Sequence, residues 1–176
     1  MKTKPFNNRV LRLALASVLA VVGGTYTVNS YSLTQTTTFV VSATVSASCT
    51  ISAAPLAFGA VGLAVLDQTS ILTATCTNGT PYVIGMSAGA GTGPTATPTA
   101  RHMNRTTAPL TDILNYTLFS DAARTINWGA GVTVVAGEVA GTGTGLAQTI
   151  TVYGRVPPQS SPVASYSDTV TAQINF

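Results

Sequence analysis

Hydrophobic and polar residues alternate along residues 36–47, TTTFVVSATVSA, close to the N-terminus of the chain. The hydrophobic positions are Phe39, Val41, Ala43 and Val45, and the residues between them are polar except for Val40. A period of two residues is typical of a β-strand with one buried face. We therefore predict a strand here, one that no preceding segment joins in a hairpin.

Similar strand patterns recur through the middle of the chain. Leu114, Tyr116 and Leu118 lie on one face of one of them, and Ile150 and Val152 are expected to point inward from another. The predicted strands occupy residues 50–59 (broken at Pro55), 69–76, 82–87, 113–119 and 148–156.

Glycine and proline divide these strands. Asn78 and Gly79 form an Asn-Gly pair, a strong hairpin signal, so the strands at residues 69–76 and 82–87 are expected to pair with each other. Residues 88–99, AGAGTGPTATPT, and the Gly/Thr-rich residues 140–145 are predicted to be loops.

The last alternating stretch, residues 166–176, is expected to form one strand. Its apolar positions are Val170, Ala172, Ile174 and Phe176, and the sequence given stops there. Without the N-terminal strand we count roughly six strands, whereas a closed sandwich of this class needs about seven. The pattern therefore predicts an all-β, incomplete sandwich that is one strand short.

An incomplete sandwich exposes a hydrophobic groove with unpaired backbone groups, which promotes aggregation unless another segment fills the groove. Residues 36–47 are the available segment. They could fold into the groove of their own molecule or into that of the next molecule, which would give a head-to-tail fibre. The ordinary alternative is that they form the first strand of their own sheet.

Composition supports a single β-rich domain. Only 7% of the residues are charged, while Thr, Ser, Ala, Gly and Val dominate. The sequence pI of about 9.1 comes from the four Lys and Arg residues within the first twelve. The rest of the chain carries four arginines against five acidic residues, a net charge of −1. This balance argues against a nucleic-acid partner.

The N-terminus has the pattern of a secretory signal peptide. A cationic start precedes an apolar run at residues 13–22 that is short for a membrane span, and small residues follow. Cleavage is expected in the interval 24–32, after Gly24 or after Ser30. We thus divide the chain into a signal peptide (residues 1–24), a polar lead-in with the N-terminal strand (25–47) and a sandwich domain (48–176).

The two cysteines, Cys49 and Cys76, both lie in the part expected to be exported, which favours a single disulfide. His102 is the only histidine, and no CxxC motif or ligand cluster accompanies it. We predict no metal site, no cofactor and no enzymatic activity, since a hydrolase would need a nucleophile with a base or paired carboxylates.

Several blocks together resemble the spore coat protein U domain family, which includes the major subunits of archaic chaperone-usher pili such as the Csu pilus. The similarity extends over nearly all of the chain from about residue 37. The blocks that carry it are CTNG at 76–79, YTLFSDAARTINWGAG at 116–131, VYGRVP at 152–157 and YSDTVTAQINF at 166–176.

The resemblance implies an immunoglobulin-like sandwich without its last strand, completed by a neighbouring subunit's N-terminal donor strand. It further implies a periplasmic chaperone, an outer-membrane usher and a cell-surface pilus that supports adhesion and biofilm formation. The family's disulfide positions correspond to Cys49 and Cys76. The donor side chains correspond to Phe39, Val41, Ala43 and Val45, and the acceptor edge, first paired with the chaperone, corresponds to Val170, Ala172, Ile174 and Phe176.

Within these blocks, Tyr116, Arg124 and Trp128 are expected to serve core and corner packing rather than ligand binding. Asp121 and Arg124 are candidates for an exposed ion pair of little energetic value. Three other functions remain open: a coat protein of resting cells from the same family, a secreted β-sandwich hydrolase, and a monomeric carbohydrate-binding module. The single Trp and scattered acids give the last two little support.

Overall fold

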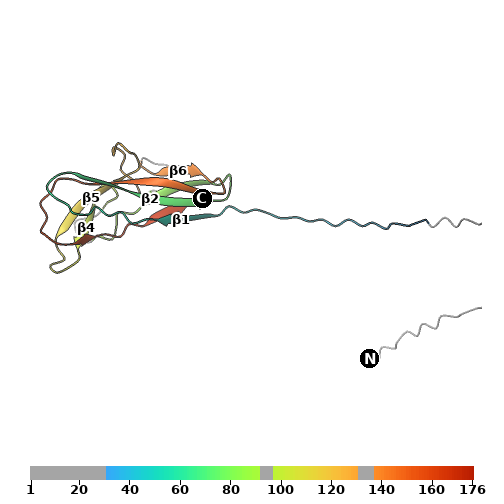
Figure 1. Cartoon of the computed structure of the whole chain (residues 1–176), viewed down its shortest axis with the longest axis horizontal. Helices are drawn as coiled ribbons and strands as arrows, with labels where there is room; N and C mark the ends of the chain where they lie inside the picture. Colours follow the sequence, from blue (N-terminus) through green and yellow to red (C-terminus); the bar gives the residue numbers. More distant parts are fainter. Residues whose placement is uncertain (1–30, 92–96, 131–136) are drawn as a thin grey trace, which may run out of the picture. The chain divides into compact units, whose positions relative to one another are not determined.

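The computed structural model describes residues 31–91, 97–130 and 137–176, so the predicted signal peptide lies outside the described residues. Within these ranges the chain forms nine strands in two sheets and no helix (Figure 1). The predicted all-β sandwich is confirmed. The strands are β1 Cys49–Ala53, β2 Leu66–Cys76, β3 Pro81–Met86, β4 Arg101–Arg105, β5 Ile113–Phe119, β6 Val139–Thr142, β7 Ala147–Val156, β8 Tyr166–Ser167 and β9 Ala172–Asn175.

The larger sheet has six antiparallel strands in the order β1-β2-β7-β5-β4-β8. Its longest ladder joins β2 to β7, with Leu66 opposite Val156 at one end and Thr75 opposite Ala147 at the other. In Figure 1, β4 and β5 lie at one end of the domain, while the C-terminus lies near β1 and β2 at the other end.

The smaller sheet has three strands in the order β6-β3-β9, which corrects the predicted hairpin between β2 and β3. Both edges of β2 are already paired, one with β1 and the other with β7, so β3 has no edge of β2 to join. The Asn-Gly turn instead carries the chain across to the second sheet. Gly79 has a φ of 81°, and its N–H donates to the carbonyl of Gly143 at 2.9 Å.

The C-terminal stretch forms two short strands in different sheets, where one continuous strand was predicted. β8 pairs with β4 in the larger sheet, and β9 pairs with β3 in the smaller one. Asp168 and Thr169 lie in the crossover between them, where they interrupt the alternation. The strands β4 and β6 were not predicted, and β6 overlaps the residues that we expected to form a Gly/Thr-rich loop.

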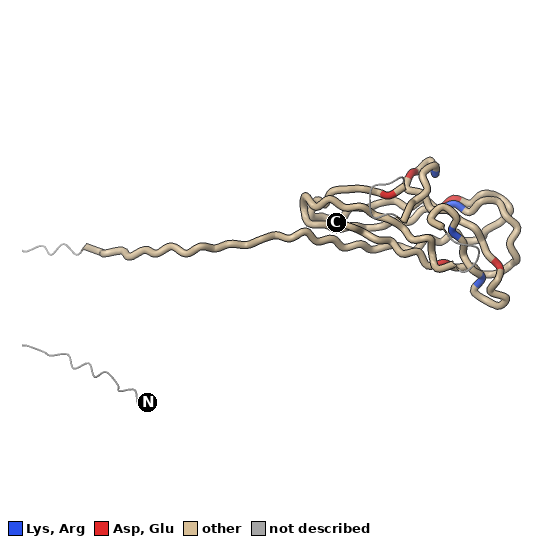
Figure 2. The backbone as a smooth tube through the Cα atoms, turned by 180° about the vertical axis from the view of Figure 1, so that it is seen from behind, with Lys and Arg blue, Asp and Glu red and all other residues tan. Residues whose placement is uncertain are grey.

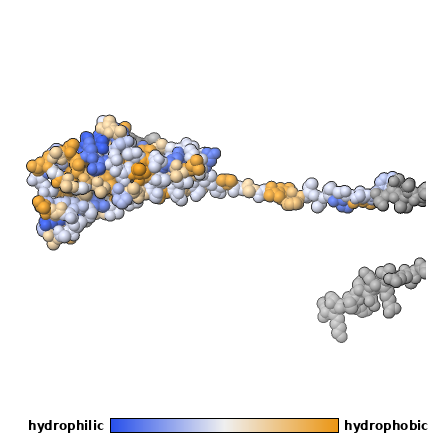
Figure 3. Space-filling view, in the orientation of Figure 1, coloured by the Kyte–Doolittle hydropathy of each residue, from blue (hydrophilic) through white to orange (hydrophobic). Residues whose placement is uncertain are grey.

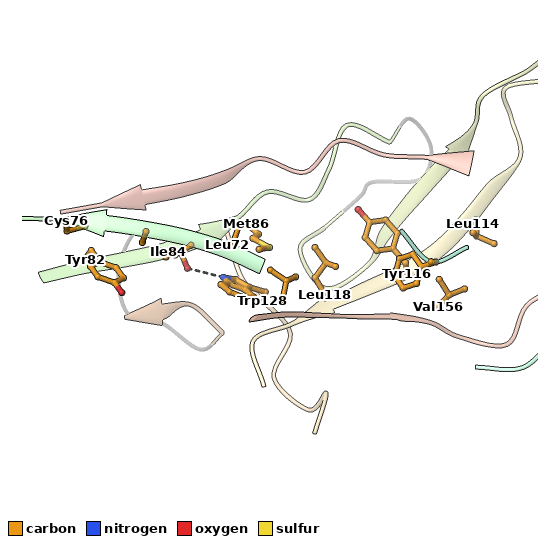
Figure 4. Packing of buried hydrophobic residues seen from close by; sticks show 13 residues of the cluster. Leu72, Cys76, Tyr82, Ile84, Met86, Leu114, Tyr116, Leu118, Trp128 and Val156 are labelled. Atoms are coloured by element: carbon orange, nitrogen blue, oxygen red, sulfur yellow. Dashed lines mark hydrogen bonds between the residues drawn. The ribbon is translucent and has the colours of Figure 1, made fainter. Parts of the chain in front are cut away.

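A hydrophobic core fills the space between the sheets, and Trp128 is completely buried within it. Its indole Nε1 donates to the carbonyl of Ile84 at 3.0 Å, so Trp128 fixes β3 from inside the core (Figure 4). The predicted inward positions on β5 and β7 are confirmed. The buried core residues are Phe58, Leu72, Ala74, Cys76, Tyr82, Ile84, Met86, Leu114, Tyr116, Leu118, Trp128, Val152 and Val156.

Residues 31–48 belong to neither sheet, and each of their side chains is exposed. The predicted strand at residues 36–47 is therefore not formed in the isolated chain, because a strand needs a hydrogen-bonded partner. The sandwich itself begins with β1 at Cys49.

Candidate functional site

An open groove of about 940 Å³ exposes part of the core between the two sheets. Its rims are residues 53–63, which start at the last residue of β1, and residues 159–170, which contain β8 and lead toward β9. Among the described residues, β1 is one of the two outer strands of the larger sheet and β9 one of the two of the smaller sheet, and β1 and β9 lie close together. The floor of the groove includes the core residues Leu72, Met86, Leu114, Tyr116, Leu118 and Val152.

The first rim is held against the larger sheet by a hydroxyl and by close packing. Ser70 Oγ donates to the carbonyl of Ala54 at 2.7 Å and lies 3.1 Å from that of Pro55. Beyond Pro55, Leu56 and Phe58 pack over Gly154, where an added Cβ would lie 2.8 Å from the Phe58 ring. Gly154 therefore permits this apolar rim to approach the sheet.

Asp168 holds the second rim. Its Oδ2 accepts a 2.5 Å hydrogen bond from the hydroxyl of Tyr116, and its Oδ1 accepts from the amides of Ala90 at 2.8 Å and Thr169 at 2.7 Å. Burial, and then the hydrogen bond to Asp168, raise the pKa of the Tyr116 hydroxyl. An added Cβ at Gly89 would collide with the Asp168 carboxylate. We call this Tyr116–Asp168 contact the rim latch, since it ties the β8–β9 crossover to the groove floor.

A buried arginine binds the backbone of several segments that are far apart in the sequence. Arg101 is fully buried and donates to four backbone carbonyls, those of Ser87, Pro98, Met86 and Trp128. Burial lowers its pKa to about 10. Sequence reasoning missed this role, because a polar segment such as RHMNR lacks the alternation that marks a strand.

The ion pairs at the corner next to β2 and β7 differ from the predicted pair between Asp121 and Arg124. Arg124 instead lies 3.4 Å from the carboxylate of Asp67, which Arg155 also binds at 2.7 and 2.8 Å. The hydrogen bond from Arg155 lowers the pKa of Asp67. Asp121 accepts from backbone amides of its own loop, including that of Ile126 at 2.8 Å. Two residues of this block, Tyr116 and Trp128, are buried in the core, as predicted.

Charged residues lie away from the end of the domain that holds the C-terminus (Figure 2). Among the described residues, no group of three or more His, Cys, Asp or Glu could hold a metal ion. The same part of the chain contains no helix that is long and apolar enough to span a membrane.

The predicted donor residues carry exposed hydrophobic side chains. Phe39, Val41 and Val45 are 84%, 82% and 82% exposed, and Ala43 is also exposed. Together with Val40 they produce a hydrophobic stretch on the N-terminal segment (Figure 3). Such a run of exposed apolar side chains is costly in water and typical of a surface that binds a partner.

The predicted acceptor residues are not all in the groove. Val170 and Ala172 line it, whereas Ile174 packs against the core from β9. Phe176 is 59% exposed and lies at a separate, shallower hollow. Their pairing with a chaperone stays a prediction. Tyr116 was predicted as a core residue, but its hydrogen bond to Asp168 was not, and neither was the place of residues 53–63 at the groove.

Cys49 and Cys76 form the predicted disulfide. They also lie opposite each other in the β1–β2 ladder, at the end of β1 that directly follows residues 43–48.

Comparison with solved structures supports the sandwich fold. The crystal structure of a CsuC-CsuE chaperone-tip adhesion subunit pre-assembly complex, from archaic chaperone-usher Csu pili of Acinetobacter baumannii, contains a similar chain. The TM-score is 0.54 and the sequence identity 24%, and the match covers 76% of this chain and 40% of that chain. No curated protein sequence matches this chain. The family model of the Spore Coat Protein U domain matches residues 35–173, and the chain therefore belongs to the spore coat protein U domain family.

Proposed function

We propose that the protein is a structural subunit of a surface pilus, which polymerises by donor-strand complementation in a chaperone-usher pathway. The observation that carries this proposal is the presence, in one chain, of an open apolar groove and of an alternating hydrophobic segment outside both sheets. Residues 36–47 of one subunit would fill the groove of the next.

The chemistry of the groove suits an added strand. Its floor is apolar and open to solvent, and an extended chain laid into it would cover this surface by strand addition. Burying each larger donor side chain, such as Phe39, Val41 or Val45, contributes about 1 to 3 kcal/mol. A joint of this kind dissociates slowly because the whole strand must leave at once.

The N-terminal segment joins β1 at one end and the groove lies toward the other end, which favours an open fibre over a closed dimer. The groove begins at Ala53 and Leu72, whereas the disulfide at Cys49, where the N-terminal segment enters β1, does not line it. A donor at one end of β1 and an acceptor at the other would make a head-to-tail contact, which builds a filament when the rotation between subunits does not close a ring. A donor segment on this chain suits a shaft subunit, because a tip subunit donates no strand.

Other steps of the pathway follow from the same groove. An unfilled groove exposes core residues, so a subunit in transit needs a cover, and we assign that role to a periplasmic chaperone with Val170, Ala172, Ile174 and Phe176 at the paired edge. An outer-membrane usher would then exchange the chaperone for the next donor. The signal peptide predicted at residues 1–24 would supply export, and the finished pilus would serve adhesion and biofilm formation at the cell surface.

Gel electrophoresis of the exported chain, produced with its chaperone and usher, tests the proposal. Unheated samples in SDS should show a ladder of multimers that collapses on boiling, and deletion of residues 36–47 should abolish it. Val41→Asp should abolish it as well, since a charge would enter the groove. Val40→Asp is the matched control, because Val40 lies off the alternating face and the ladder should survive. Monomers at both temperatures in the unmodified chain would refute the proposal.

A further inference from the structure

Thr77 binds the chain at the point where it enters the sandwich. Its backbone N–H donates to the carbonyl of Ser48 at 2.9 Å. Its Oγ1 lies 3.3 Å from the carbonyls of both Ser46 and Ser48. The adjacent residues, Cys49 and Cys76, are joined by the disulfide. We call Thr77, Ser46, Ser48 and this disulfide the exit clamp.

The exit clamp fixes the direction of the chain. Ser48 and Thr77 extend the β1–β2 register by one pair beyond Cys49 and Cys76, so residues 46–48 continue β1 past the end of β2. The groove lies toward the opposite end of β1, where its lining begins at Ala53.

Insertion of residues 36–45 into the groove of their own molecule would require the chain to reverse within residues 46–48. Those are the residues that Thr77 binds, so reversal would break its hydrogen bonds. Their sequence, Ser46-Ala47-Ser48, also lacks the Gly or Asn that short hairpin loops need at positive φ.

We propose that Thr77 is a positioning residue that directs the N-terminal segment outward and reserves each groove for a segment from another molecule. This inference rests on the proposed function, since it concerns which donor enters the groove. The disulfide holds the first residue of β1 in place covalently, and Thr77 extends that restraint over the three residues where reversal would occur.

Hydrogen exchange at the amides of residues 36–47 tests this role in the full exported chain. At dilutions where size-exclusion chromatography shows monomers, wild type should exchange freely over this segment and become protected only in multimers. Thr77→Val removes the Oγ1 donor at nearly constant shape. It should raise the ratio of self-closed to open monomers about two- to fivefold, the effect of one hydrogen bond.

Thr77→Ser keeps the hydroxyl and should behave as wild type. Adding Cys49→Ser and Cys76→Ser to Thr77→Val should increase self-closure further, seen as segment protection that is independent of concentration. Two results would overturn the inference: a wild-type monomer that already protects residues 36–47, or a Thr77→Val chain with wild-type exchange and multimer yield.

A labelled synthetic peptide of residues 36–47, added to the same full-length variants, separates this inference from the proposed function. If the peptide binds while Thr77→Val has no effect on exchange, the groove accepts a donor and only the role of Thr77 is refuted. If the peptide binds to none of them, donor-strand complementation is refuted, and the role of Thr77 falls with it.

Discussion

The rim latch gives a prediction for stability, because a single substitution removes its one side-chain hydrogen bond. Tyr116→Phe removes one hydroxyl and leaves the buried ring in place, including its edge-on contact with Phe58 at 6.2 Å between centroids. No cavity forms, because the hydroxyl points out of the core toward Asp168. The change therefore isolates the hydrogen bond between groove floor and rim.

The expected cost follows from the charge of the acceptor. A hydrogen bond to a charged group contributes about 1.5 to 3 kcal/mol, and the lower end applies because Asp168 is only half-buried and water can replace the lost donor. We expect Tyr116→Phe to lower the free energy of unfolding by about 1.5 kcal/mol. Tyr166→Phe is the matched control, since the Tyr166 hydroxyl donates to the neutral carbonyl of Pro162 and should contribute only about 0.5 to 1 kcal/mol.

Alkaline pH adds a second readout. The raised pKa of Tyr116 means that the folded chain holds this proton more tightly than the unfolded chain does. The associated stability is complete below about pH 10 and is lost as the pH rises further, by about 1.4 kcal/mol per pH unit. Tyr116→Phe should lack this loss. Comparing the two chains at each pH cancels the groups that do not interact with Tyr116, whereas Arg101, which does interact with it, contributes to the difference.

Urea denaturation near neutral pH, followed by the fluorescence of Trp128, the only tryptophan, measures the first effect. Circular dichroism measures the second at alkaline pH. A Tyr116→Phe chain within about 0.5 kcal/mol of wild type, with the same alkaline slope, would show that the latch does not hold the rim.

Three further predictions concern parts outside the groove. Asp67→Asn should flatten the acid titration of stability: the depressed pKa of Asp67 stabilises wild type above about pH 4, and this contribution is lost as the pH falls through the folded pKa. Arg155→Gln should show the same flattening in circular dichroism. Trp128→Phe should cost about 2 to 4 kcal/mol in urea denaturation followed by circular dichroism, because it leaves a buried carbonyl without its donor. Gly79→Ala should cost about 1 to 2 kcal/mol for its positive φ, whereas Gly62→Ala, also in open space, should change the unfolding free energy by less than about 0.5 kcal/mol.

Local periodicity predicted the strands that build the core, and it failed where a strand is polar or short. β5 and β7 carry buried residues at every second position, so their sequence alone shows both strand and inward face. β4, RHMNR, is held by partners that no pattern shows, chiefly the carbonyls that surround Arg101.

Pairing is a property of the whole sheet, which explains the two topological errors. The Asn-Gly signal at Gly79 correctly indicated a turn, but which edge the next strand joins depended on β1 and β7. In the C-terminal stretch, Asp168 was a usable signal for the crossover: a carboxylate inside an alternating run needs donors, and here Tyr116 and backbone amides provide them.

The position of the disulfide has a mechanical consequence. Cys49 is the first residue of β1, so a pull on the N-terminal segment reaches the sandwich at a covalent bridge to β2. β1 cannot be peeled away residue by residue, because the load passes directly into β2. That strand is paired along ten residues with β7, and a force parallel to the strands must shear this whole ladder at once. In a fibre of such subunits, tension that arrives through the N-terminal segment would therefore pass into the β2–β7 ladder of the larger sheet.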